Sequence, residues 1–271
     1  MGVLVILHWR IINDSLIING TKSMFTSLDY PAQRLWLLFL LFLWAILLFG
    51  GFIFGSSDDK EGRRMPRWTR LSSSAVLVLA AWSLFLFTRD GPVAIYALLI
   101  ALGMTFGFLG DLFIAGVLVQ SGGKIGGIAS FALGHICYIT AILWLSGTLG
   151  LTAQGYMLGA LLLWWLIALA GWYFIVYRGA AVTRMHWLVL PYALLLATTA
   201  GAATALTLQE PAFWPLALGA ALFLLSDMIL GGEWFNDLQL PLIHDIIWLT
   251  YGPGQMLIVI SIGIANSAAW S

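Results

Sequence analysis

Charged residues are scarce in this chain. They make up 9% of its 271 residues, whereas a soluble domain is usually about a quarter charged. Hydrophobic residues make up 61%, and this combination excludes an ordinary soluble domain and indicates an integral membrane protein. The 12 Lys and Arg residues balance the 12 Asp and Glu residues, so no excess of positive charge points to a nucleic acid as a partner.

Cysteine and histidine are also rare. The one cysteine, Cys137, lies in an apolar run, where we expect a small buried side chain, and it cannot form an internal disulfide. The four histidines form neither an HExxH motif nor a cluster, so a zinc hydrolase is poorly supported. We therefore expect neither a metal site nor a cofactor.

Long apolar runs separate cleanly at clusters of charge, glycine and proline. Crossing a bilayer takes about 20 residues, and inside lipid a helix satisfies all of its own backbone groups. The eight predicted spans lie at about 34–55, 71–88, 93–119, 125–146, 152–177, 186–208, 213–231 and 243–265. The predicted fold is an all-α membrane protein, a single bundle of eight transmembrane helices over residues 31–271. Residues 1–30 are expected to be a peripheral N-terminal segment, because their apolar run is too short to span.

The distribution of Lys and Arg predicts the orientation. The loops after spans one, three, five and seven hold eight of these residues, and the opposite side holds two, or four with Arg10 and Lys22. The positive-inside rule places the richer side in the cytoplasm, with both termini outside. We expect a multi-pass protein of a bacterial inner membrane; its oligomeric state is not readable from the sequence.

Two aspartates interrupt apolar runs. Asp111 lies in FGFLGDLFIAG and Asp227 in LFLLSDMILGG, near the ends of two spans that run in the same direction, so both are expected at similar depth. An ionisable residue inside a membrane is costly and marks a functional site by default, although hydration at the interface or helix capping is the simpler alternative. Two neighbouring carboxyl groups away from water tend to divide into one protonated and one ionised, which acid–base catalysis requires. The similar residues around the two aspartates also suggest a weak parallel repeat, in which spans one to four correspond to spans five to eight.

Other polar residues are expected to join them. His135 and Tyr138 share a face of the fourth predicted span, where they would equally suit a core pair. Asp245 opens the eighth span on the same side as the aspartates, where it would equally suit capping. Tyr251 and Gln255 lie four residues apart around Gly252-Pro253-Gly254, which predicts a break in that helix.

Several classes could use two membrane aspartates. An intramembrane aspartyl protease carries a Tyr-Asp and a Gly-x-Gly-Asp pair, and here the text is GFLGD with no Tyr-Asp inside a span. A proton-coupled transporter, or a lipid-binding membrane protein, would use the same carboxylates and a broken helix. The sequence is therefore compatible both with an enzyme and with a transporter or lipid-binding protein.

The sequence resembles the YhhN-like membrane family, which includes the mammalian lysoplasmalogenases. The shared marks are a Gly-Asp (110–111), an H-x-x-Y (135–138), GAALFLLSD (219–227) and a Tyr with a nearby Gln (251 and 255), all in order over roughly 95–260. An early Lys-Pro that family members tend to carry is missing from the first two spans, so residues 1–90 are expected to lie outside the match.

The resemblance implies a hydrolase that cleaves the vinyl ether of a lysoplasmalogen into a fatty aldehyde and glycerophospho-ethanolamine or -choline. Its partners would be the lysophospholipid substrate and the surrounding membrane lipids. Asp111 and Asp227 would be the catalytic pair, as in glycosidase carboxylate pairs. The residues expected to orient the substrate, water or carboxylates are His135, Tyr138, Asp245, Tyr251 and Gln255.

Overall fold

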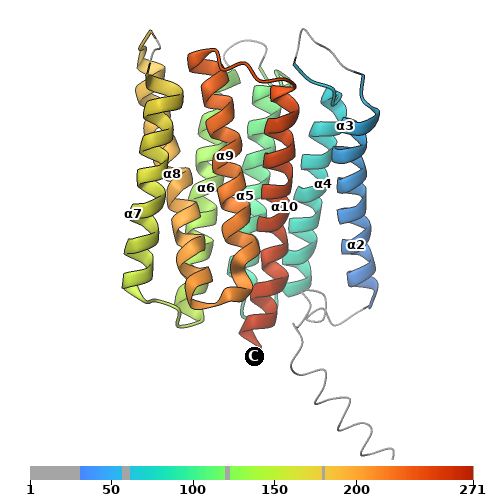
Figure 1. Ribbon diagram of the computed structural model, residues 1–271. Coiled ribbons are helices and arrows are strands. Elements are labelled where there is room, and N and C mark those ends of the chain that lie inside the picture. The colour runs from blue at the N-terminus through green and yellow to red at the C-terminus, as the bar shows by residue number, and fades with distance from the viewer. Residues whose placement is uncertain (1–30, 57–61, 120–122, 179–180, 271) are drawn as a thin grey trace, which may run out of the picture.

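The computed structural model of the protein describes residues 31–56, 62–119, 123–178 and 181–270. Within these residues, eight helical spans are long and apolar enough to cross a membrane, and they stand side by side in one bundle (Figure 1). The predicted eight-helix membrane fold is confirmed, and the protein is a multi-pass membrane protein. The predicted peripheral segment, residues 1–30, lies outside the described residues. The four-plus-four repeat stays a prediction.

The spans follow one another with short connections. The first consists of α2 (Pro31–Ala45), the π-helix η1 (Ile46–Gly50) and α3 (Gly51–Phe54). The next three are α4 (Arg67–Thr88), α5 (Ala94–Ile114) and α6 (Gly123–Thr148). The fifth is α7 (Gln154–Gly171) continued by the π-helix η2 (Trp172–Tyr177), and the sixth is α8 (Arg184–Gln209). The last two are α9 (Trp214–Asn236), preceded by the short 3-10 helix η3 (Pro211–Phe213), and α10 (Ile243–Ala269).

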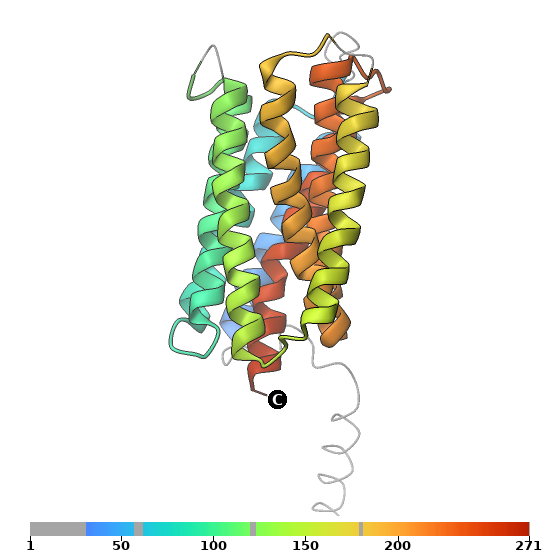
Figure 2. The same cartoon turned by 90° about the vertical axis from the view of Figure 1, so that its left-hand side faces the viewer.

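The eighth span, α10, lies at the centre of the packing. It contacts α9, α4 and α5, and more of it is buried than of any other described span. Turned by 90°, the bundle shows α5 and α6 on one side and α7 and α9 on the other (Figure 2). The end of the bundle where α5 and α9 finish and α6 and α10 begin, drawn at the top of Figure 1, is named the upper end here. The positive-inside rule predicts that this end faces the cytoplasm.

The third span is shorter than predicted. We expected it to reach residue 119, but α5 ends at Ile114, and a turn follows in which Gly116 adopts a left-handed backbone with φ of 68°. Glycine takes this conformation without the steric cost of a Cβ atom. The apolar residues 117–119 therefore belong to a connection at the upper end and not to the membrane helix, which hydropathy alone did not reveal.

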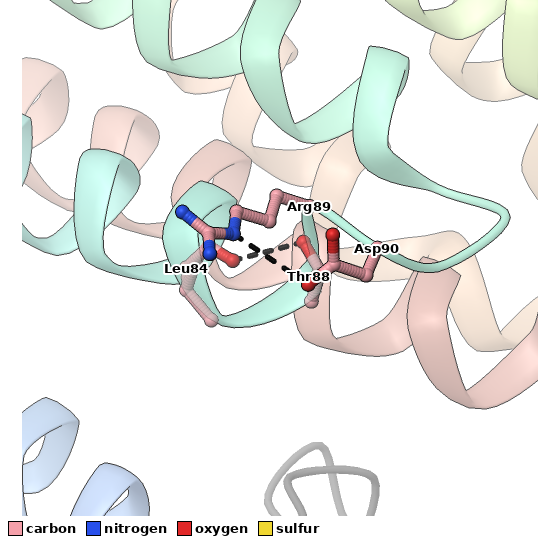
Figure 3. Close-up of polar contacts among 4 residues, drawn as sticks. All are labelled: Leu84, Thr88, Arg89 and Asp90. Carbon is pink, nitrogen blue, oxygen red and sulfur yellow. Dashed lines mark hydrogen bonds and ion pairs between the residues drawn. The ribbon is translucent and has the colours of Figure 1, made fainter.

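The opposite, lower end closes with tight turns. After α4, Thr88 donates its hydroxyl to the carbonyl of Leu84 at 2.9 Å, and Arg89 pairs with Asp90 at 3.5 Å (Figure 3). Both charged side chains are well exposed, so this pair lies outside the core, beyond the end of α4.

The predicted break in the eighth span is wrong. Although Pro253 lies inside it, α10 is one continuous α-helix. The glycine that follows this proline serves helix packing. A Cβ atom on Gly254 would lie 2.9 Å from the carbonyl oxygen of Gly219 on α9, and a Cβ atom on Gly219 would lie 2.7 Å from the carbonyl oxygen of Gly254. Small residues let membrane helices approach this closely. Departures from regular α-helix occur instead at η1 and η2.

Candidate functional site

Asp111 lies in the last turn of α5 and bonds residues of two other helices, α4 and α10. Its side chain is 5% exposed, and its Oδ2 accepts hydrogen bonds from the Ser74 hydroxyl of α4 at 2.6 Å and from the Tyr251 hydroxyl of α10 at 3.1 Å. Hydroxyls from two other helices thus fix one oxygen of a carboxyl group that lines a cavity.

Tyr251 is itself held in place from behind. Gln255, one turn further along α10 and fully buried, donates its Nε2 to the Tyr251 oxygen at 2.5 Å. Gly107 of α5 makes room for this pair, because a Cβ atom there would lie 3.0 Å from that Nε2. With the amide donating to its oxygen, the Tyr251 hydroxyl directs its own proton at Asp111. Gln255, Tyr251 and Asp111 therefore form one oriented chain of hydrogen bonds.

Asp227 has a comparable arrangement on α9. The hydroxyl of Tyr192, from α8, donates a short hydrogen bond to its Oδ2. The neighbouring Ser226 hydroxyl, which donates to the carbonyl of Phe223 at 2.7 Å, lies 3.3 Å from its Oδ1. Asp227 is half-buried, more open than Asp111. Hydroxyl groups therefore bond both carboxyls. Those that bond Asp111 come from α4 and α10, whereas the tyrosine that bonds Asp227 comes from α8.

The two aspartates line the same cavity. It has a volume of about 420 Å³, opens at the upper end, and is bounded by α4, α5, α6, α9 and α10. Four basic side chains line this cavity as well: Arg63, Arg67, Arg70 and Lys124. We name it the polar cavity.

Two tryptophans flank the basic side chains. The Arg70 guanidinium lies 5.6 Å from the ring centre of Trp248, and the Lys124 amine lies 4.6 Å from that of Trp234. Both rings line the polar cavity, and such cation–π contacts hold flexible basic side chains beside it.

A second cavity adjoins the first. It is narrow, about 50 Å³, and lies among α6, α8, α9 and the α7–η2 span. Apolar side chains dominate its wall, including Ala168, Val176, Ala193 and Leu196, and we name it the apolar cavity. Four residues line both cavities: Phe131, Asp227, Leu230 and Trp234.

His135 and Tyr138 lie outside both cavities. The Nδ1 of His135 is 2.9 Å from the Thr199 hydroxyl, and the Tyr138 hydroxyl donates to the Met104 sulfur at 3.1 Å. The His135 ring also packs edge-on against Tyr192, the donor to Asp227, with 6.5 Å between ring centres. Of the two residues, His135 is therefore linked to an aspartate through one intermediate, because it packs against the tyrosine that bonds Asp227.

Asp245 holds backbone instead of lining a cavity. It is 1% exposed, and its carboxylate accepts the backbone N–H groups of Arg64 at 2.5 Å and Met65 at 2.9 Å. The segment before α4 is thereby fastened to the start of α10, next to Arg63 of the polar cavity. Of the five predicted supporting residues, Tyr251 bonds Asp111 directly and Gln255 supports it through Tyr251, whereas the other three do not join this chain of hydrogen bonds.

Two hydroxyl partners were missed at the sequence level. Ser74 carries a detectable signal, because Arg67, Arg70 and Ser74 follow at spacings of three and four on one helical face. Tyr192 carries none, since it is one aromatic residue among many in an apolar helix. The described residues contain no group of three or more His, Cys, Asp or Glu side chains that could hold a metal ion.

The sequence was compared with curated proteins, solved structures and protein-family models. Searches among curated proteins and among solved structures gave no match. A model of the YhhN family matches residues 67–262, well over half of the chain. The match begins earlier than the motifs suggested, so the expectation that residues 1–90 lie outside it is wrong for α4, which supplies Ser74 and the arginines. The chain belongs to the YhhN family.

Proposed function

We propose that this protein is a lysoplasmalogenase-like hydrolase that cleaves the vinyl ether bond of a single-chain phospholipid. The products would be a fatty aldehyde and a glycerophospho-alcohol such as glycerophospho-ethanolamine or -choline. The observation that carries the proposal is the placement of Asp111 and Asp227, from separate helices, on one cavity at the upper end. The resemblance to a family that includes lysoplasmalogenases supplies the reaction.

The chemistry needs a proton donor and a stabilising carboxylate. Transfer of a proton to the alkenyl carbon distal to the ether oxygen converts the vinyl ether into an oxocarbenium ion. Water then adds to the carbon next to oxygen and loses a proton, giving a hemiacetal. The hemiacetal collapses to the aldehyde and releases the glycerol hydroxyl. General acid–base help contributes about 10²–10⁴-fold, and a nearby negative charge stabilises the cation.

The two aspartates have surroundings suited to different roles. Two hydroxyls converge on a single oxygen of Asp111, and hydrogen bonds of this kind stabilise the charged form of a carboxyl group. Asp227 lines both cavities, at the border of the apolar cavity where the alkenyl carbon would lie. We assign Asp227 as the proton donor and Asp111 as the carboxylate that stabilises the cation and receives the proton of water.

The supporting residues would act through these two. Tyr251 and Gln255 hold Asp111, and His135 supports Tyr192, the donor to Asp227. Tyr138 and Asp245 would contribute to the shape of the site through packing and through the segment before α4. In the proposed setting, a bacterial inner membrane, the polar cavity opens toward the cytoplasm and takes its substrate from the surrounding lipids.

A proton-coupled transporter or lipid-binding protein is the second candidate, favoured by the same two carboxyl groups in the polar cavity. The broken helix on which that reading also relied is absent from α10, which leaves it with less support than the enzyme.

Purified protein in detergent, given a lysoplasmalogen, tests the proposal. We expect fatty aldehyde from the vinyl ether and none from the saturated alkyl-ether analogue, which cannot be protonated at carbon. Failure to release aldehyde, combined with proton-dependent lipid uptake in vesicles, would favour the transporter.

A further inference from the structure

We infer that the polar and apolar cavities form one two-part site, which binds a single-chain phospholipid with its phosphate among the basic residues and its hydrocarbon chain in the apolar cavity. This assignment deepens the proposed function and rests on it for the identity of the reacting bond. It concerns the orientation of the ligand, which the two carboxylates alone do not determine.

The basic half of the site suits a phosphate. Four of the chain's 12 Lys and Arg residues line this one cavity, while its two aspartates lie deeper, toward the membrane. Arg63, Arg67 and Arg70 come from the start of α4 and the segment before it, whose N-terminal backbone also favours an anion. Arginine forms paired hydrogen bonds to phosphate oxygens. A ligand with only a hydroxyl at its polar end would use none of these charges.

The apolar half suits a hydrocarbon chain. Asp227 is the one formally charged residue among the described residues that line it, and the wall is otherwise built of aliphatic and aromatic side chains. Its small volume accommodates the first carbons of a chain, and the remainder would extend toward the lipid. The π-helix η2 contributes Trp172 and Val176 to this wall. Such irregular turns frequently occur at functional sites.

The junction of the two halves determines which bond meets the acid. The cavities share Phe131, Asp227, Leu230 and Trp234, so a ligand that extends from one into the other passes Asp227 where its polar and apolar parts join. In a lysoplasmalogen, the vinyl ether lies at that boundary, between the glycerol and the chain. The two-part site therefore delivers this bond to the proposed proton donor, and keeps the phosphodiester several bonds away.

Binding of lipids that cannot be cleaved tests the inference separately from catalysis. The probes are a saturated alkyl-ether lysophospholipid, the matching alkyl glycerol without phosphate, and inorganic phosphate alone. Equilibrium binding would be measured on purified full-length protein in detergent. We expect the lysophospholipid to bind at least tenfold more tightly than the alkyl glycerol, because charged hydrogen bonds to its phosphate are lost in the latter.

Each half has a variant and a matched control. Arg67→Gln combined with Lys124→Gln, both exposed side chains of the polar cavity, should weaken lysophospholipid binding about tenfold and leave alkyl glycerol binding unchanged. Arg184→Gln, at the same end but outside the cavity, should change neither. Ala193→Leu should fill the apolar cavity and weaken both lipids, whereas Ala170→Leu, on the exposed face of α7, should not.

The outcomes separate the two proposals. Three results would each overturn the two-part site. The first is equal binding of the two lipids, and the second is unchanged lipid binding by an Ala193→Leu variant that elutes as a single folded species. The third is competition by inorganic phosphate as strong as by the lysophospholipid. If the expected binding pattern appears but no vinyl ether is hydrolysed, the site stands and the enzymatic proposal fails. Hydrolysis of an alkenyl glycerol as fast as of its phosphorylated counterpart would leave the enzyme and remove the phosphate subsite.

Discussion

The upper and lower halves of the bundle treat buried polar side chains differently. In the lower half, Tyr96 and Ser261 are both fully buried and bond to each other at 2.6 Å. Because the Ser261 hydroxyl already donates to the carbonyl of Ile258, Tyr96 must be the donor of this bond. Neither residue lines the polar or the apolar cavity. Their hydrogen bonds satisfy each other within a packed core.

In the upper half, the hydroxyls point at carboxyls, and the carboxyls line a cavity. Ser74 and Tyr251 converge on Asp111, while Tyr192 donates to Asp227. A buried acid is far more costly to keep in a membrane than a hydroxyl, so its retention beside a cavity calls for a role that packing does not provide. The difference teaches that burial alone does not mark a site; the open cavity and the charge together do.

The largest effect should follow removal of either acid. Asp111→Asn and Asp227→Asn keep the shape of the side chain and remove the ability to ionise, so each should lower aldehyde release by about 10²–10⁴-fold. Aldehyde would be measured per unit of folded protein, with size-exclusion profile and thermal unfolding as controls. Full activity in either variant would contradict the proposed pairing.

Asp245→Asn should act on stability instead. This carboxylate accepts two backbone N–H groups, and an amide in its place can accept only one of them with its oxygen. A loss of about 1–3 kcal/mol is expected, because a buried donor is left unsatisfied. Thermal unfolding in detergent measures it. A variant as stable as the parent would show that the anchoring of the segment before α4 does not depend on this charge.

A matched pair of tyrosine variants compares the two halves directly. Tyr251→Phe removes one donor to Asp111, so we expect about a tenfold slower reaction together with about 1 kcal/mol of lost stability. Tyr96→Phe removes the bond to Ser261 in the lower half, with a similar loss of stability and no change in rate. Equal rates for both variants would erase the distinction between the halves.

The smallest effect is expected at the lower surface. Arg89 and Asp90 are 62% and 93% exposed, and exposed ion pairs contribute about 0–1 kcal/mol. Arg89→Gln should therefore change stability by less than about 0.5 kcal/mol and leave lipid binding unaltered. Lipid binding and thermal unfolding would be measured beside the Arg67→Gln/Lys124→Gln variant. Weakened lysophospholipid binding by Arg89→Gln would mean that the basic residues act through overall charge and not through the polar cavity.

The sequence was sufficient for the spans because lipid demands long apolar runs, and charge marks their ends. It was sufficient to single out Asp111 and Asp227, which line one cavity, because a carboxyl in such a run stands out; their catalytic role stays a prediction. It failed at Pro253, since whether a proline opens a helix depends on the surrounding packing, and here the neighbouring Gly254 packs closely against Gly219 of α9. It also failed at Tyr192, whose partner lies 35 residues away on another helix. Such pairings depend on helix rotation, which hydropathy does not specify.

Isotope labelling tests the central claim most directly. Lysoplasmalogen would be incubated with the protein in D₂O, and separately in H₂¹⁸O, with the aldehyde trapped as it forms and both products analysed by mass spectrometry. Protonation at carbon by the aspartate pair predicts one deuterium on the aldehyde carbon next to the carbonyl, and no ¹⁸O in the glycerophospho product. An aldehyde without deuterium, or ¹⁸O in the glycerol fragment, would contradict the mechanism.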